Sequence, residues 1–265
     1  MSLIRGPFLV IYRHRDLLLR TTMSDVRQRY AGLAGGLLWM GLSPFLLMSL
    51  YAVVYVAIFQ IRPVSLTRLE YVVYIFSGLI PLFGFVEALN AGTGSLAANR
   101  AVLLNTVFPA ELVPIRAVIV SHVTTVFGLA ILVAATVVLR KAALTLLLVP
   151  LCLLLQVMFV AGITWLLSLG NLVLRDIQQF LTYATLILLM VSPVAYTPDM
   201  VPRRLAVIIY LNPLSYFVVT FQNLILFGRL PSAEVALACV ALGIGSFCVG
   251  FSIFSRIKQV FFDYA

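Results

Sequence analysis

Charge is the scarcest property of this sequence. Only 10% of its 265 residues are charged, whereas 63% are hydrophobic, and the mean hydropathy is +1.11. A soluble domain of this length carries a much larger share of charged residues. The composition therefore excludes a soluble globular protein and predicts an integral membrane protein.

Residues suited to catalysis or metal binding are also few. Histidine occurs only at His14 and His122, and the three cysteines, Cys152, Cys239 and Cys248, all lie in apolar runs. An odd number of cysteines in such runs indicates small buried side chains, not a disulfide framework or a metal site. Neither lysine follows a glycine, so the sequence has no GxxxxGK[ST] phosphate-binding loop. The chain cannot hydrolyse ATP by that route, and we expect it to bind no cofactor or metal of its own.

Long apolar runs fill most of the chain. A bilayer core of about 30 Å requires about 20 apolar residues per helix. This length predicts six transmembrane helices, at residues 33–60, 71–92, 115–139, 143–170, 177–197 and 233–255. We therefore expect one all-α membrane domain that occupies residues 1–265.

A further apolar segment, 201–228, is broken by the pair Asn212-Pro213. Proline lacks a backbone donor and disfavours helix at the preceding residue. Broken backbone at membrane depth must be buried in protein or line a water-filled cavity. The segment is therefore predicted to be a re-entrant pair of short helices on the periplasmic side, and a seventh span is the alternative.

The distribution of basic residues predicts the orientation. With six spans, 11 of the 18 lysines and arginines lie on the cytoplasmic side when both termini are placed there. The excess comes from the N-terminal arm, residues 1–32, which does not resemble a cleaved signal peptide. In this orientation Arg175 and Asp176 form a tight cytoplasmic turn between the fourth and fifth spans.

The N-terminal arm contains the pattern of an amphipathic helix. Apolar residues recur at spacings of four, three and four, at Leu19, Met23, Val26 and Tyr30. Thr21 or Thr22 is expected to cap this helix, with Asp25 in its first turn. Basic interfacial helices bind anionic lipid head groups. The segment is either a surface anchor and topology signal or a gate that meets a phosphate-bearing lipid, with a glycine hinge at Gly32, Gly35 and Gly36.

The longest loop predicted after the arm on the cytoplasmic side contains a short apolar helix, 101–107, followed by Pro109. An exposed apolar helix usually indicates that a partner protein covers it. The alternative is a loop that packs on its own bundle.

Glu87 is the only acidic residue in the interior of a predicted span, since Glu234 stands at the very start of the sixth. A carboxylate at that depth is costly unless it faces water or a partner. A transport role and a packed carboxyl at a subunit contact both satisfy this requirement.

Three aromatic residues, Tyr51, Tyr55 and Phe59, follow one another at i,i+4 spacing near the outer end of the first span. An interfacial aromatic belt accounts for such a stripe. Stacking against sugar rings in an export pathway is the alternative.

Several separate segments, in order, carry a family resemblance: "RQRYAGLAGGLLWMGLSPFLL", "SGLIPLFGFVEALNAGTGSLAANRAVLLNTVFPAELVPI", "GNLVLRDIQQF" and "SPVAYTPDMVPRRLAVIIYLNPLSYFVVTFQNLILFG". Together they resemble the membrane subunit of ABC-2 polysaccharide exporters, a family that exports O-antigen, capsule or teichoic acid chains. The resemblance covers nearly the whole chain and is closest to the O-antigen permeases.

The resemblance implies a non-enzymatic subunit of the bacterial inner membrane, with both termini in the cytoplasm. It implies a homodimer that binds two copies of a separate cytoplasmic P-loop ATPase, on which ATP and Mg are held. The implied substrate is a polysaccharide linked to undecaprenyl pyrophosphate, moved to the periplasm among membrane lipids. Nucleic acid is not an implied partner.

The resemblance also implies roles for residues at matching positions. A gate helix over 23–30 includes Arg27, Arg29 and Tyr30. A coupling helix over 99–108 and its exit supply the ATPase contact through Asn99, Arg100, Asn105, Phe108 and Pro109. The cytoplasmic mouth contains Glu87, Arg175 and Asp176, near Asn171, and the glycan path contains Tyr51, Tyr55, Phe59 and Tyr196. One departure is that Arg100 is the only basic residue near the coupling helix, where the family often has more.

Two other classes of function are weighed against the exporter. A membrane enzyme of glycan or lipid assembly would need a positioned acid, base or nucleophile, and His122, Glu87 and Asp176 are predicted to lie too far apart in depth. An ion-coupled secondary transporter would show titratable pairs near mid-membrane and often an inverted repeat, and neither is evident. Replacing Glu87 by glutamine separates these classes, since only a coupled carrier should lose ion dependence.

Overall fold

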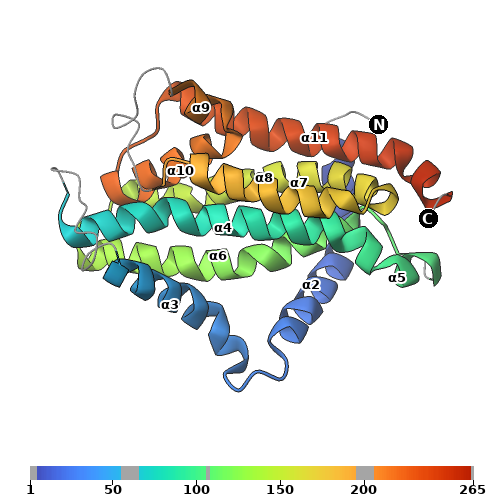
Figure 1. Ribbon diagram of the computed structural model, residues 1–265, viewed down its shortest axis with the longest axis horizontal. Coiled ribbons are helices and arrows are strands. Elements are labelled where there is room, and N and C mark those ends of the chain that lie inside the picture. Colours follow the sequence, from blue (N-terminus) through green and yellow to red (C-terminus); the bar gives the residue numbers. More distant parts are fainter. Residues whose placement is uncertain (1–4, 55–65, 106–107, 195–205, 264–265) are drawn as a thin grey trace.

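The computed structural model describes residues 5–54, 66–105, 108–194 and 206–263. Within these ranges the secondary structure is helical and contains no strand, which confirms the all-α class (Figure 1). Helix α4 (Arg68–Ala98) lies at the centre of the bundle. Around it lie α6 (Leu112–Val138), α7 (Val149–Val173), α8 (Asp176–Val191) and α10 (Pro213–Gln222), and α11 (Ala233–Asp263) packs along α7.

Four helices in the described part of the chain are long and apolar enough to cross a membrane: Arg68–Ala98, Leu112–Val138, Leu144–Val173 and Ala233–Gln259. They match the second, third, fourth and sixth predicted spans. At the first and fifth predicted spans the structure has the shorter apolar helices Gly36–Leu50 and Asp176–Val191. Parts of both predicted spans, within 55–65 and 195–205, lie outside the described residues, so the total of six stays a prediction.

Helix α4 begins with a capping box. Thr67 Oγ1 accepts from the backbone N–H of Glu70, and Glu70 Oε2 accepts from the backbone N–H of Thr67 at 2.8 Å. Lys141, from the connection between α6 and α7, pairs with the same carboxylate at 2.9 Å. The helix then continues through Pro81, whose carbonyl accepts from Gln156 Nε2 at 2.6 Å, and ends six residues beyond the predicted boundary at residue 92. These contacts fix the start of α4 and join its middle to α7.

Helices α7 and α11 approach closely because glycine lies at their crossing. A Cβ atom at Gly250 would collide with the backbone carbonyl of Gly162, and one at Gly162 would collide with the backbone of Ser246. Ser246 Oγ donates across the same contact to the carbonyl of Phe159 at 3.2 Å. Membrane helices commonly associate through small residues and such short polar contacts.

The predicted helix break at Asn212-Pro213 is present. Helix α9 (Ala206–Leu211) ends before Asn212, and α10 begins at Pro213. Asn212 is buried; its side-chain oxygen caps α10 by accepting from Leu214 N, and its Nδ2 donates to Ser192 Oγ at 2.9 Å. After α10 comes a π-helical turn, η5 (Asn223–Phe227). Re-entry of this pair into a membrane stays a prediction.

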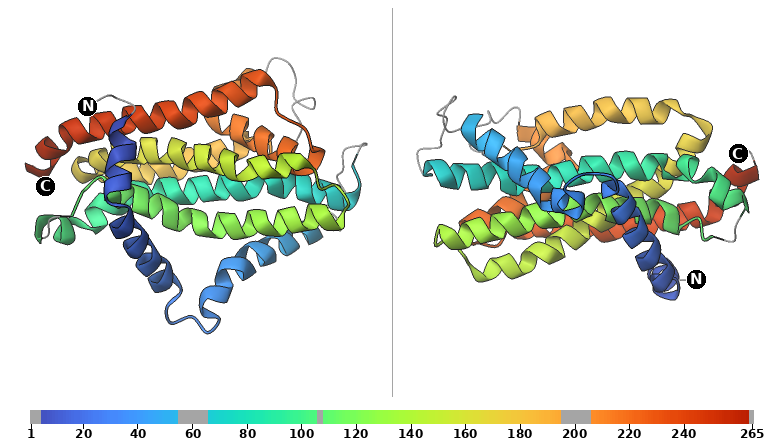
Figure 2. Two further views of the ribbon diagram at one scale, coloured as in Figure 1. Left: turned by 180° about the vertical axis from the view of Figure 1, so that it is seen from behind. Right: turned by 90° about the horizontal axis from the view of Figure 1, so that it is seen from below.

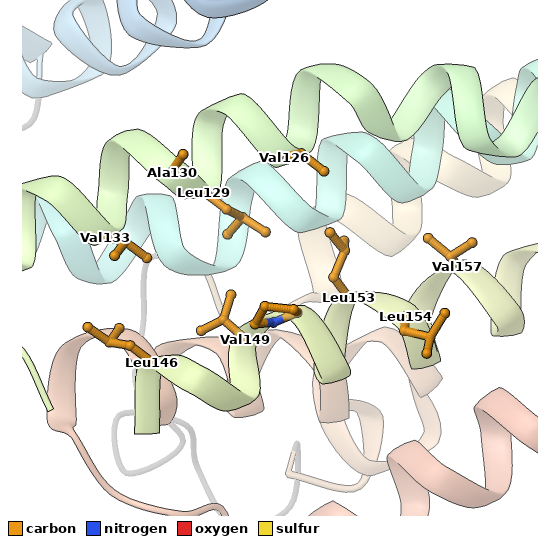
Figure 3. A pocket seen from close by; sticks show the side chains of 10 residues that line it. Val126, Leu129, Ala130, Val133, Leu146, Val149, Leu153, Leu154 and Val157 are labelled. Carbon is orange, nitrogen blue, oxygen red and sulfur yellow. The ribbon is translucent and has the colours of Figure 1, made fainter. Parts of the chain in front are cut away.

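A groove of about 600 Å³ lies between α6 and the start of α7 (Figure 3). Its lining side chains are almost all aliphatic, among them Leu129, Val133, Leu146 and Leu153. The groove presents almost no hydrogen-bonding side chain, so it suits lipid hydrocarbon and not a sugar or a phosphate.

The N-terminal segment forms a V on one side of the bundle (Figure 1). Its arms are α2 (Arg15–Tyr30) and α3 (Trp39–Val53), which the turn η1 (Gly36–Leu38) precedes. A shorter helix, α1 (Arg5–Arg13), lies before α2 and touches α11, with the rings of Phe8 and Phe247 5.5 Å apart (Figure 2).

Glycine is needed in the turn that joins the two arms of the V. Gly32 has φ +82° and Gly36 has φ +49°, whereas Gly41 lies within α3. A Cβ atom at Gly32 or Gly41 would meet no other atom within 4 Å. Alanine at these two positions therefore tests backbone conformation alone.

We expect Gly32→Ala to destabilise the turn by about 1–2 kcal/mol, the usual cost of a left-handed L-residue. Gly41→Ala should be neutral or slightly stabilising, because alanine favours helix over glycine. Limited proteolysis of the purified variants at residues 31–36 measures the difference. Equal cleavage of the two variants would contradict a conformational requirement at Gly32.

Candidate functional site

The short helix α5 (Arg100–Asn105) lies outside the bundle, at the end where α11 finishes (Figure 1). Val102 and Leu104 on this helix are 47% and 59% exposed, and Asn105 Nδ2 donates back to the carbonyl of Ala101. The structure thus contains an exposed apolar helix within the predicted coupling segment. Residues 106–107 of that segment lie outside the described part of the chain.

The exit from α5 is attached to two other helices through Glu111. The indole Nε1 of Trp165 in α7 donates to the Glu111 carbonyl at 2.9 Å, and Lys258 in α11 forms an ion pair with the Glu111 carboxylate. Glu111 is buried and Trp165 is almost fully buried. The residue at which the chain leaves the coupling segment, just past Phe108 and Pro109, is therefore fixed to α7 and α11.

Arg116, in the second turn of α6, contacts both the coupling segment and the arm. Its Nη2 donates to Asn99 Oδ1, at the end of α4, at 2.9 Å. Its Nε lies 2.8 Å from Asp25 Oδ2 on α2. The guanidinium also lies over the ring of Phe108, 6.0 Å from its centroid. One side chain thus joins α2 to both flanks of α5.

A second set of contacts joins the end of α2 to the bundle. Arg29 forms an ion pair with Glu87 of α4. Tyr30 Oη lies 3.2 Å from Thr124 Oγ1 of α6. Thr124 is eight residues beyond Arg116, or about 12 Å along α6. Helix α2 therefore runs obliquely along α6 and does not cross it at a single level.

The N-terminal boundary predicted for the arm helix is wrong. Helix α2 begins at Arg15, with Asp16 in its first turn, and Thr21 Oγ1 bonds to the Leu17 carbonyl inside the helix. Asp25 is therefore not an N-terminal acidic residue but the ion-pair partner of Arg116. Of the predicted apolar stripe, Val26 is buried, Tyr30 is half-buried, and Leu19 and Met23 are exposed.

Two cavities border these contacts. The larger, about 530 Å³, lies between α2, α4, α6 and α8, and its polar lining residues include Asp25, Asn90, Asn99, Arg116 and Gln178. The smaller, about 300 Å³, lies between α3, α4 and α6, and its polar lining residues are Ser43, Glu87, Thr124 and Thr125. The larger cavity offers amide and charged groups and the smaller one hydroxyl groups and a carboxylate, so both suit polar ligands, in contrast to the aliphatic groove of Figure 3.

Arg175 and Asp176 occupy the predicted turn between α7 and α8. Both are exposed, and in the described part of the chain neither forms an ion pair. The third residue predicted at this mouth, Glu87, instead pairs with the arm. Asn171 is buried one turn before the charged pair. The two charges are thus open to solvent or to a partner.

The glycan path stays a prediction. Tyr51 lies in the last turns of α3, but its side chain is outside the described part of the chain, as are Tyr55, Phe59 and Tyr196.

The residues weighed for enzyme chemistry have different surroundings. His122 is buried in α6, with Nδ1 2.9 Å from the Val118 carbonyl, whereas Glu87 pairs with Arg29 and Asp176 is exposed. Across the described ranges, no three His, Cys, Asp or Glu residues are placed to hold a metal ion.

The roles of Arg116 and Lys258 do not follow from the sequence. In the sequence, each of them is recognisable only as a basic residue near the end of a predicted span. Their partners, Asp25 and Glu111, are far away in the chain. Charged residues that flank a predicted coupling segment are the one available signal.

Comparison with known proteins supports the resemblance seen in the sequence. No family model matches the chain. Two proteins named "O-antigen export system permease protein RfbA" from Klebsiella pneumoniae are 25% and 26% identical over 248 residues, which are 93% of this chain and 93% of each relative. A protein of the same name from Myxococcus xanthus is 24% identical over 254 residues, covering 95% of this chain and 96% of the relative. The predicted resemblance is confirmed: this multi-pass membrane chain is a relative of the ABC-2 O-antigen export permeases over nearly its whole length.

Proposed function

We propose that this chain is the channel-forming subunit of an ATP-driven exporter of O-antigen polysaccharide. In this proposal, undecaprenyl-pyrophosphate-linked chains pass from the cytoplasm to the periplasm between two copies of the subunit in the inner membrane. Both termini are in the cytoplasm. Two copies of a separate P-loop ATPase, which hold ATP and Mg, drive the transport.

The observation that carries the proposal is the presentation of α5. Its exposed side chains include Val102 and Leu104, and its two flanks are held by Arg116 and by the Glu111–Lys258 pair. A protein that hydrolysed its own ATP would not need an exposed apolar helix that is held at both ends, because no separate ATPase would have to bind it. A docked ATPase would cover that helix and could transmit movement through its held flanks.

The arm supplies a second argument. Arg29 forms an ion pair with Glu87, whereas Arg27, two residues earlier and so on nearly the opposite side of α2, is exposed and forms no ion pair in the described part of the chain. An exposed arginine at a membrane surface attracts anionic head groups. In the proposal, Arg27 meets the phosphate-bearing lipid, while Arg29 and Tyr30 hold the gate helix against the bundle.

The names of the relatives favour O-antigen over capsule or teichoic acid as the exported chain. The surroundings of His122, Glu87 and Asp176 do not favour a membrane enzyme, because none of the three cavities described above is lined by more than one of these residues.

The proposal is tested by affinity purification of the tagged protein from its host membrane in mild detergent. Mass spectrometry of the eluate should show a P-loop ATPase in equal amount, and the eluate should hydrolyse ATP in a vanadate-sensitive manner. A folded, monodisperse protein that brings down no ATPase would contradict the proposal.

We expect Arg175→Ala and Asp176→Ala to reduce export without removing the protein from the membrane. Both side chains are exposed at the turn between α7 and α8, so their loss should not disturb the core. Surface glycan and membrane-fraction protein are measured in the same cells. Normal surface glycan in both variants would refute the role given to this turn.

A further inference from the structure

We propose that Arg116 is a positioning residue that transmits movement of the coupling segment to the gate helix α2. The inference rests on the proposed function, because it requires an ATPase that moves α5. It adds a residue that the family resemblance did not indicate, and it names the atoms that make the link.

The link combines a directed hydrogen bond and an ion pair on one guanidinium. Nη2 donates to Asn99 Oδ1 at 2.9 Å, and Nε lies 2.8 Å from Asp25 Oδ2 in an ion pair without hydrogen-bond geometry. These partners belong to different elements, the end of α4 just before α5 and the middle of α2. The planar guanidinium directs Nη2 at Asn99 while its charge stays beside Asp25, whereas a lysine ammonium is a single point charge on a flexible stem.

Partial burial strengthens the ion pair between Arg116 and Asp25. The Arg116 side chain is 15% exposed, and that of Asp25 is 32% exposed. Charged groups that are partly removed from water are screened less by salt than surface pairs are. Loss of the guanidinium would leave the Asp25 carboxylate without its charged partner, so α2 would lose a contact that specifies its position.

The two flanks of α5 are held differently. After α5, Glu111 is attached to α7 and α11 through Trp165 and Lys258. Before α5, Asn99 is attached to α6 through Arg116, which also lies over the Phe108 ring. Movement of α5 would therefore reach α7 and α11 through Glu111, and α2 through Arg116, which contacts both flanks.

Space beside Arg116 permits such movement. The cavity of about 530 Å³ is lined by Asp25, Asn99 and Arg116 together, and α4, α6 and α8 form its other walls. The side chains of the link can shift into this cavity without displacing packed aliphatic residues.

The test measures hydrogen–deuterium exchange in the purified complex, before and after trapping with ATP and vanadate. In the wild type, trapping should change exchange in both α5 and α2. In Arg116→Gln, the change in α5 should persist while the change in α2 falls by about fivefold or more, the lower range of a typical coupling between sites. Arg116→Lys should fall between the two, because it keeps the charge beside Asp25 but not the directed Nη2 bond to Asn99.

Two further variants keep the test decisive. Asn99→Ala removes only one half of the link and leaves the ion pair with Asp25, so it should weaken the response of α2 even if Arg116→Gln folds poorly. Asp16→Asn changes an exposed acid on α2 whose ion pair in the described part of the chain is with its neighbour Arg15, and it should respond as the wild type does.

The outcomes separate this inference from the proposed function. A complex without an ATPase would contradict the proposed function. A complex whose ATPase hydrolyses ATP, and whose α2 responds equally in the wild type, Arg116→Gln and Asn99→Ala, would overturn the role of Arg116 alone.

Discussion

Replacing Gly250 by alanine should destabilise the bundle strongly, although the change adds only one methyl group. The new Cβ atom would collide with the backbone carbonyl of Gly162 on α7, and a backbone cannot rotate away as a side chain can. Helices α7 and α11 would have to separate along their contact. Added volume at such a site costs about 1–3 kcal/mol, and more where the backbone must move.

Gly245 offers a matched control on the same helix. A Cβ atom there would meet nothing within 4 Å, so Gly245→Ala should be neutral or stabilise α11 through its higher helix propensity. Thermal unfolding of the two variants in detergent, followed by size-exclusion fluorescence, measures the difference. Equal midpoints for Gly250→Ala and Gly245→Ala would show that the close approach of α7 and α11 is not required for stability.

The helical bundle is largely predictable from the sequence because apolar run length depends on local composition. Residues 71–92 are expected to span the membrane, and α4 covers them and extends to Ala98. The break at Asn212-Pro213 is also predictable, since proline acts on its immediate neighbours. The close packing of Gly162 on Gly250 is not, because it depends on which faces of two distant helices meet.

The site is predictable only in part, for a similar reason. The family resemblance singles out Arg29, and local features single out Tyr30 and Glu87, but their sequence positions do not show that Arg29 and Glu87 form an ion pair. The local pattern predicts that Asp25 lies at the start of a helix. In the structure α2 begins ten residues earlier, at Arg15, and Asp25 forms an ion pair with Arg116. Contacts between residues this far apart in the chain depend on tertiary packing, which local periodicity does not encode.

Reversing the charge of Glu87 should impair export more strongly than neutralising it. Glu87→Gln keeps a group that accepts a hydrogen bond from Arg29, and both side chains are more than one-third exposed. An exposed ion pair contributes about 0.2–1 kcal/mol, so this variant should lose only a few-fold of activity. Glu87→Arg places two cations together at the end of α2 and beside the 300 Å³ cavity, where they should push the arm away from α4. We expect surface glycan to fall by about tenfold, equivalent to about 1.4 kcal/mol.

The double variant Arg29→Glu with Glu87→Arg tests whether the attraction itself is what matters. It restores opposite charges across the same contact, so it should recover a substantial part of the export that Glu87→Arg loses. Asp16→Arg makes the same kind of charge reversal on α2 at an exposed position, where the recorded ion pair is with the neighbouring Arg15, and it should leave export nearly unchanged. If the double variant were as defective as Glu87→Arg, Glu87 would act in export through something other than its pair with the arm. Equal loss in Asp16→Arg would instead indicate that added positive charge on the protein, and not the loss of this particular ion pair, impairs export.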